Sequence, residues 1–164
     1  MLTRHRILRD GFTTGLVGAA AVAVWFLIVD VIAGRPLFTP AVLGSFAFFG
    51  LRDAATVSVS VQPVVMYTLT HLLVFLFVGM VASVIIAEAE KEPRVLWLLA
   101  EFFIVFEVGF YAIVALFFTP LLAVLAWTNV AVGNLIAAVS MGYYLWRARP
   151  ALRAVLRDQS PEDR

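Results

Sequence analysis

The stretch LWLLAEFFIVFEVGFYAIVALFFTPLLAVL, residues 96–125, decides the fold class because nearly all of its side chains are apolar. A helix needs about 20 apolar residues to cross the roughly 30 Å hydrocarbon core of a bilayer. Backbone amides and carbonyls in lipid must be satisfied within the chain, so an apolar run of this length is expected to be helical. The sequence therefore predicts an all-α membrane protein.

Other apolar runs divide the chain into four predicted membrane-spanning helices. The expected spans are about 12–33, 63–87, 95–118 and 121–147. Thr119 can cap and Pro120 can open the fourth helix, so the last two spans should form a tight hairpin. We expect residues 1–164 to form one integral membrane domain, an antiparallel four-helix bundle.

The composition excludes many functions. Hydrophobic residues make up 63% of the chain and charged residues 14%, far from the balance of soluble domains. Cysteine is absent, which excludes disulfides, zinc–thiolate sites and thiol nucleophiles. The sequence has no Walker loop, dinucleotide fingerprint, metalloprotease pair, nucleophile elbow or basic nucleic-acid patch. We therefore expect a protein that is not an enzyme and does not bind nucleic acid.

The distribution of positive charge predicts the topology. Eleven of the twelve basic residues are arginine; three lie within the first nine residues and four between residues 147 and 157. Positive residues favour the cytoplasmic side, so both termini and the 88–94 turn are predicted to be cytoplasmic.

The connection over residues 34–62 is too apolar for an ordinary solvated loop. Residues about 39–50 are too few to span and are expected to form an interfacial or re-entrant segment. This segment could cap the outer end of the bundle or gate a substrate or quinone. Residues 56–61 alternate polar and apolar side chains, a weak strand signal. The stretches GRPLFTPAVLG (34–44) and YTLTHLLVF (67–75) resemble bacterial four-helix membrane proteins, which implies a bacterial cytoplasmic (inner) membrane but no activity.

Polar residues within the spans supply the candidate site. Folding the predicted hairpins at 1.5 Å per residue brings them to similar depths. The expected layer contains His71, Glu107, Asn129 and Asn134, with Tyr67 on the helix face of His71. It could be a hydrogen-bond cluster that fixes helix register or a pathway for protons or ions. No metal site and no cofactor are predicted, although His71 could ligate a single haem or chlorin.

Two further acids lie near the ends of the spans. Glu101 lies six residues before Glu107 and about 120° around the helix, so the two do not share a face. Glu101 could reach the membrane interface, meet an arginine or face another subunit. Asp30 lies near the end of the first span, where a salt bridge with Arg35 is expected.

Two segments are expected to make contacts. The first helix carries small residues at helical spacing, which permit close approach of another helix of this chain or of a second protein. These residues are Gly11, Gly15, Ala19 and Ala23. The tail over residues 148–164 is predicted to form an amphipathic helix on anionic lipid headgroups. Its anchors would be Arg149, Arg153 and Arg157.

Taken together, these features favour a non-catalytic accessory or scaffold subunit of a larger energy-transducing complex, respiratory or photosynthetic. Its partners would be the lipid bilayer and other membrane subunits, or further copies of itself. One alternative is a small proton- or ion-coupled transporter or channel that uses Glu107 and His71. Another is a redox subunit that binds haem or pigment.

Overall fold

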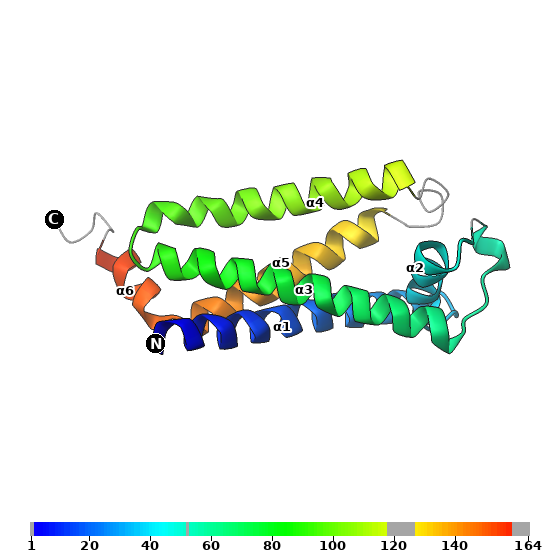
Figure 1. Cartoon of the computed structure of the whole chain (residues 1–164), viewed down its shortest axis with the longest axis horizontal. Helices are drawn as coiled ribbons and strands as arrows, with labels where there is room; N and C mark the ends of the chain where they lie inside the picture. The colour runs from blue at the N-terminus through cyan, green and yellow to red at the C-terminus, as the bar shows by residue number, and fades with distance from the viewer. Residues whose placement is uncertain (1, 52, 118–126, 159–164) are drawn as a thin grey trace.

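The computed structural model describes residues 2–51, 53–117 and 127–158, and the regular structure in these ranges is helical throughout. Four long helices run alternately in opposite directions (Figure 1). These are α1 (Leu2–Ile32), α3 (Val61–Ala89), α4 (Trp97–Phe117) and α5 (Trp127–Ala148). The short elements are α2 (Phe38–Phe48), η1 (Ala54–Thr56), η2 (Pro93–Leu96) and α6 (Pro150–Asp158). The alternating stretch 56–61 belongs to no strand and leads from η1 into α3.

Three of the described helices are long and apolar enough to cross a membrane: Arg4–Ile32, Val61–Ala89 and Pro93–Leu116. These helices are consistent with an integral membrane protein in contact with lipid. The described part of α5 is more polar, with two asparagines and Arg147. The apolar sequence expected to begin this span, residues 121–126, and the expected Thr119–Pro120 corner lie outside the described residues.

The helix α1 begins ten residues earlier than the predicted span. No glycine or proline precedes Gly11, so nothing in the local sequence stops the helix. Its 31 residues extend about 46 Å at 1.5 Å per residue, which is longer than the hydrocarbon core. The first turns of α1, which carry three arginines, therefore extend beyond the apolar part of the helix.

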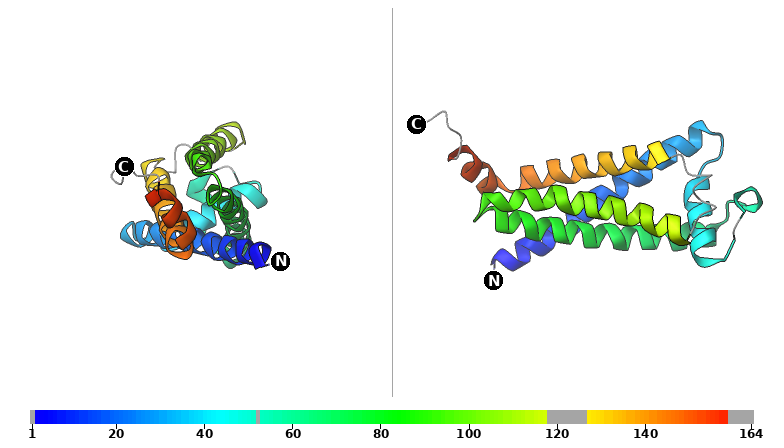
Figure 2. Two further views of the ribbon diagram at one scale, coloured as in Figure 1. Left: turned by 90° about the vertical axis from the view of Figure 1, so that its left-hand side faces the viewer. Right: turned by 90° about the horizontal axis from the view of Figure 1, so that it is seen from above.

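The helices α1, α3 and α5 form the closely packed part of the bundle (Figure 2). A Cβ atom added at Gly15 would lie 2.6 Å from the Phe75 carbonyl oxygen and 2.7 Å from the Leu76 Cα atom. One at Gly79 would meet the backbone of Gly11 and Gly15. Glycine is therefore needed on both helices where α1 crosses α3. The adjoining buried cluster consists of Ala19, Val22, Phe75, Val78, Ala137 and Met141.

The helix α4 stands apart from the other three long helices (Figures 1 and 2). Only 6% of its most apolar segment is buried, against 44% for α3. Phe102 and Phe106 reach the buried cluster from α4, and a cavity of about 130 Å³ lies among α3, α4 and α5. The backbone of α4 thus lies far from the other helices, and large aromatic side chains make the contact between them.

The short helix α2 lies at the end of the bundle opposite α6 (Figure 1). Val42 and Phe46 are buried there and contact Val114 and Val130. Both carboxylate oxygens of Asp30 accept hydrogen bonds from Thr39, at 2.7 Å from its backbone nitrogen and 2.7 Å from its hydroxyl. Asp30 therefore holds the first turn of α2.

The expected salt bridge between Asp30 and Arg35 is wrong. The Arg35 amide donates to the Asp30 backbone carbonyl at 2.8 Å, and the Arg35 guanidinium lies 3.9 Å from the ring centroid of Phe38. The sequence spacing placed the two charges within reach of each other. In the structure the two oxygens of the Asp30 carboxylate accept hydrogen bonds from Thr39 instead.

Candidate functional site

Glu107 joins α4 to α5. The side-chain amide of Asn134 donates to Oε2 of Glu107 at 2.6 Å, and both groups are partly buried. A hydrogen bond between spanning helices is worth about 0.6 kcal/mol on average, which suits a role in positioning. Glu107 therefore provides a specific link at an interface that is otherwise loosely packed.

No hydrogen bond or ion pair joins His71 to Glu107 in the described part of the chain. The Nε2 atom of His71 lies 3.2 Å from the Ala19 backbone carbonyl oxygen, so it contacts α1. Tyr67 lies on the same side of α3, and its ring centroid is 5.8 Å from that of His71. The expected single layer assumed that helices joined by a short turn are neighbours. In the structure α3 packs mainly on α1 and α2, and α4 stands apart.

Asn129 makes a third, separate contact. Its backbone carbonyl accepts a hydrogen bond from Nε1 of Trp25 at 2.8 Å, which links α5 to α1. The predicted polar residues are thus distributed over three helix interfaces. Within the described ranges, no three His, Asp or Glu side chains are grouped so that they could hold a metal ion.

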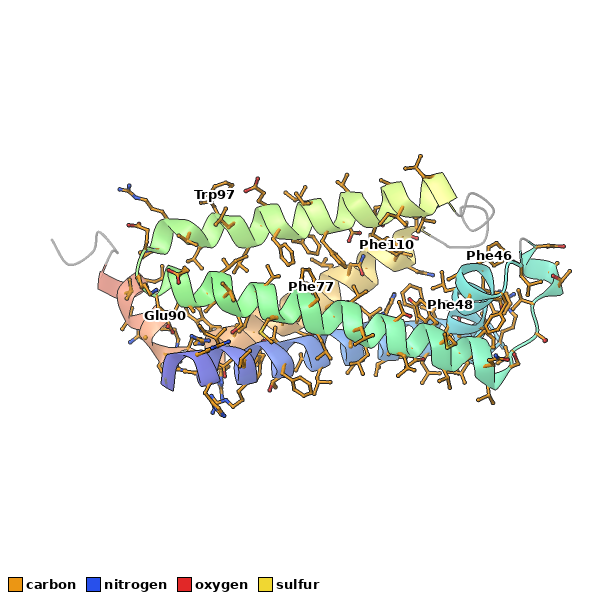
Figure 3. The ribbon with its side chains drawn as sticks, viewed as in Figure 1. Phe46, Phe48, Phe77, Glu90, Trp97 and Phe110 are labelled. Atoms are coloured by element: carbon orange, nitrogen blue, oxygen red, sulfur yellow. The ribbon has the colours of Figure 1, made fainter. Side chains whose placement is uncertain are left out.

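The largest buried ionic cluster among the described residues lies elsewhere and was not predicted. Nε of Arg149 lies 2.8 Å from Oδ2 of Asp10, and the two side chains are 1% and 0% exposed. The Arg149 guanidinium also lies 3.3 Å from Oε2 of Glu90 and donates to the Ser83 hydroxyl at 3.2 Å. Figure 3 shows Glu90 at the end of α3 that faces α6. The cluster therefore ties α1, α3 and α5 together at one end of the bundle.

Neighbouring residues add hydrogen bonds to this cluster, although Oε1 of Glu90 has no hydrogen-bond partner among the described residues. Arg9 donates to Oδ1 of Asp10 at 3.1 and 3.0 Å. Ser83 in turn donates to the Ile7 backbone carbonyl at 3.0 Å. An acid directly after three arginines, near the start of an apolar helix, was the available sequence signal. The signal could not identify Arg149, which lies almost at the other end of the chain.

The expected role of Arg149 as a lipid-headgroup anchor is wrong, because its guanidinium is buried against two carboxylates. Arg153 is half-buried, and Arg157 is exposed on the last turn of α6. Leu152, on the expected lipid-facing side, is 2% exposed and packs against Ile86 and Leu145. Part of the apolar face of α6 is therefore covered by the protein itself.

The small-residue face of α1 meets α3. Gly11 and Gly15 approach the backbone of α3, and the Ala19 carbonyl contacts His71. Ala23 is exposed beside the next turn. The small-residue face therefore packs closely on α3 at Gly11 and Gly15 and is exposed at Ala23.

Glu101 lies on the exposed side of α4. Trp97, Ile104 and Val108 are 61%, 58% and 61% exposed. They are four residues before, three after and seven after Glu101, which places all four on one helix face. Figure 3 shows Trp97 on the side of α4 away from the other long helices. We call the side chains at 97, 101, 104, 105 and 108 the outer face of α4.

Comparisons of the chain with protein-family models, with curated proteins and with solved structures found no significant match.

Proposed function

We propose that this chain is a non-catalytic accessory or scaffold subunit that docks onto a larger energy-transducing membrane complex through the outer face of α4. The observation that carries the proposal is the position of Glu101. This carboxylate is exposed and surrounded by exposed apolar side chains on a helix that contributes little to its own bundle.

The energetic argument concerns where a carboxylate can be tolerated. A charged side chain in the middle of a spanning helix costs roughly 2.5–3.5 kcal/mol on insertion scales, and less near the interface. Glu101 has no hydrogen bond or ion pair among the described residues. A partner helix that presents an arginine, lysine or amide donor at this depth would remove the cost. Trp97, Ile104 and Val108 would supply the surrounding apolar contact.

The alternative of a proton or ion pathway through Glu107 and His71 receives less support. Glu107 is bonded to Asn134 on α5, whereas His71 contacts Ala19 on α1. A cavity of about 40 Å³ beside Asn134 is lined almost entirely by apolar side chains. This arrangement favours structural roles for both residues.

The proposal includes four spanning helices and cytoplasmic termini in a bacterial cytoplasmic membrane. Its support is that α6, the start of α1 and the turn between α3 and η2 lie at the same end of the molecule (Figure 1). The absence of cysteine permits single-cysteine labelling in intact cells. An impermeant maleimide should label Ser60→Cys and should label Lys91→Cys only after the cells are opened. The reverse pattern would overturn this orientation.

The docking proposal is tested by site-specific photo-crosslinking of the full chain in its native membrane. A photoreactive residue at Val108, on the outer face of α4, should crosslink to one membrane protein in a stoichiometric complex. The matched control is Leu73 on α3, which is 67% exposed and should crosslink to lipid.

A second variant distinguishes a specific contact from random crosslinking between proteins that meet in the membrane. Glu101→Leu removes the carboxylate from the outer face while leaving it apolar, and it should release the partner during mild detergent purification. Leu73→Ala should leave the complex intact. A chain that purifies only as a homo-oligomer and moves protons in liposomes, with transport abolished by Glu107→Gln, would overturn the proposal.

A further inference from the structure

A cavity of about 220 Å³ lies where α1, α2 and α3 meet. Its walls come from one side of α1 between Val22 and Asp30, from residues 37, 39 and 40 at the start of α2, and from α3 between Val64 and His71. Most of the lining is apolar, with a few polar groups near Tyr67, which is the usual composition of a small-molecule site.

Most polar groups in the cavity already have partners. Both carboxylate oxygens of Asp30 accept hydrogen bonds from Thr39. The Thr68 hydroxyl donates to the Val64 carbonyl at 2.7 Å. These hydrogen bonds engage both groups with the protein, so they shape the wall of the cavity.

Two hydrogen-bonding groups remain for a ligand. The Tyr67 hydroxyl has no hydrogen-bond partner among the described residues. The Ala19 carbonyl can only accept, so Nε2 of His71 carries the proton of this contact and Nδ1 of the neutral ring is left as an acceptor. Tyr67 and His71 lie one turn apart on α3 with their rings inclined by 29°. The cavity thus offers one donor and one acceptor along an aromatic wall.

The cavity also reaches the lateral surface of the bundle. Val24 and Leu27 are 56% and 43% exposed where they line it, and Thr68 is exposed on the α3 side. In a membrane this opening faces lipid. A ligand could therefore enter from the bilayer and leave an apolar tail there.

The backbone is strained at Leu37, which lines the cavity at the start of α2. Leu37 has a φ of 64°, a left-handed conformation that residues other than glycine rarely adopt. Such conformations concentrate at ligand and switch sites because surrounding structure must hold them in place. Here Asp30 and Thr39 hold the adjoining turn.

We propose that this cavity binds the ring of a lipid-soluble quinone or quinol. A neutral flat ring fits beside Tyr67, His71 and Phe26, and a ring oxygen can accept from the Tyr67 hydroxyl. A quinol hydroxyl can also donate to Nδ1 of His71, whereas a quinone can use only the donor. The Asp30 carboxylate, whose two oxygens already accept from Thr39, disfavours anionic ligands, and the free hydrogen-bonding groups distinguish the site from a groove for an acyl chain.

The test uses the full-length protein in lipid nanodiscs. A photoreactive azidoquinone labels the site, and ubiquinone-1 or ubiquinol-1 competes with it. The label should map to peptides from α1 and α3. Tyr67→Phe keeps the ring and removes the hydroxyl, so it should weaken competition by ubiquinone-1 by about threefold to tenfold, the range of one neutral hydrogen bond. Tyr143→Phe is the matched control, because Tyr143 is 63% exposed on α5 and should change nothing.

Two further measurements keep the proposal falsifiable if Tyr67→Phe fails to fold. Ala23→Leu adds volume at an exposed position of the cavity wall and should abolish specific labelling. His71→Phe should weaken competition by ubiquinol-1 more than by ubiquinone-1. Equal competition by dodecanol would identify a groove for acyl chains and overturn the proposal. Labelling that is unchanged in Ala23→Leu, or that maps to α4, would also overturn it.

Discussion

The Arg149 guanidinium lies 2.8 Å from the Asp10 carboxylate, so a residue in the N-terminal part of α1 and the residue that follows α5 share one buried ion pair. Both side chains are almost completely inaccessible, and Glu90 and Ser83 complete the surroundings of Arg149. Removal of one member of such a pair leaves the other charge buried without compensation, which costs more than the pair itself contributes.

We therefore expect Arg149→Met to lower the free energy of unfolding by about 3–5 kcal/mol, the range for breaking a buried pair. Chemical unfolding in mixed detergent micelles, followed by tryptophan fluorescence, measures the loss. Arg157→Met is the control, since Arg157 is exposed in α6 and should cost little. Equal stability of the two variants would show that Arg149 is not part of a stabilising cluster.

The crossing of α1 and α3 should have no room for an added methyl group. Gly79→Ala places a Cβ against the backbone of Gly11 and Gly15, so we expect a loss of about 1–3 kcal/mol in stability, typical of overpacking. Gly142→Ala is the matched control on α5, where no described residue outside the adjoining turns of the helix lies within 4 Å of the added Cβ. That control should gain up to about 1 kcal/mol through helix propensity. Similar effects from the two substitutions would contradict the close approach.

The contact between Glu107 and Asn134 is best measured by a double-mutant cycle. Glu107→Leu, Asn134→Leu and the double variant should give a coupling of about 0.6–1.7 kcal/mol, the range for hydrogen bonds between spanning helices. Glu101→Leu should show no coupling with Asn134→Leu, because Glu101 lies on the outer face of α4. The absence of coupling at Glu107 would mean that this bond does not hold α4 in place.

Asp30 should control the order of α2. Asp30→Ala removes two acceptors for Thr39, and losing a helix cap costs about 0.5–2 kcal/mol. Hydrogen exchange over residues 38–48 should accelerate while exchange in α3 stays unchanged. Asp53→Ala removes a comparable cap on exposed η1 and should leave α2 unaffected. Unchanged exchange in α2 would show that another contact holds this turn.

Local sequence was sufficient to predict the apolar helices, because their length and composition are properties of each segment. The segment expected at residues 39–50 forms the helix α2 over Phe38–Phe48 for the same reason. Positions of polar side chains relative to one another required knowledge of which helices are neighbours. His71 faces Ala19 and not Glu107, because α3 packs on α1 despite its short connection to α4.

Asp10 and Arg149 show a second limit of sequence reasoning. Each lies beside other charged residues, so local patterning assigns both to a solvated or headgroup-facing surface. Their burial arises only when the ends of α1, α3 and α5 meet. The pairing of Glu107 with Asn134 could be predicted in part from the sequence, since both residues were expected at similar depths on helices joined by a tight turn.

The ion pair between Asp10 and Arg149 has a consequence for biosynthesis. The ribosome produces Asp10 well before Arg149, so α1 is synthesised before the residue that pairs with it exists. Until then the cations nearest to Asp10 are Arg6, which lies beside its Oδ2 atom, and Arg9, which lies beside its Oδ1 atom. Synthesis beyond α5 supplies the missing charge, so a nascent chain that has not yet reached residue 149 differs in the electrostatics of α1 from a chain that includes it.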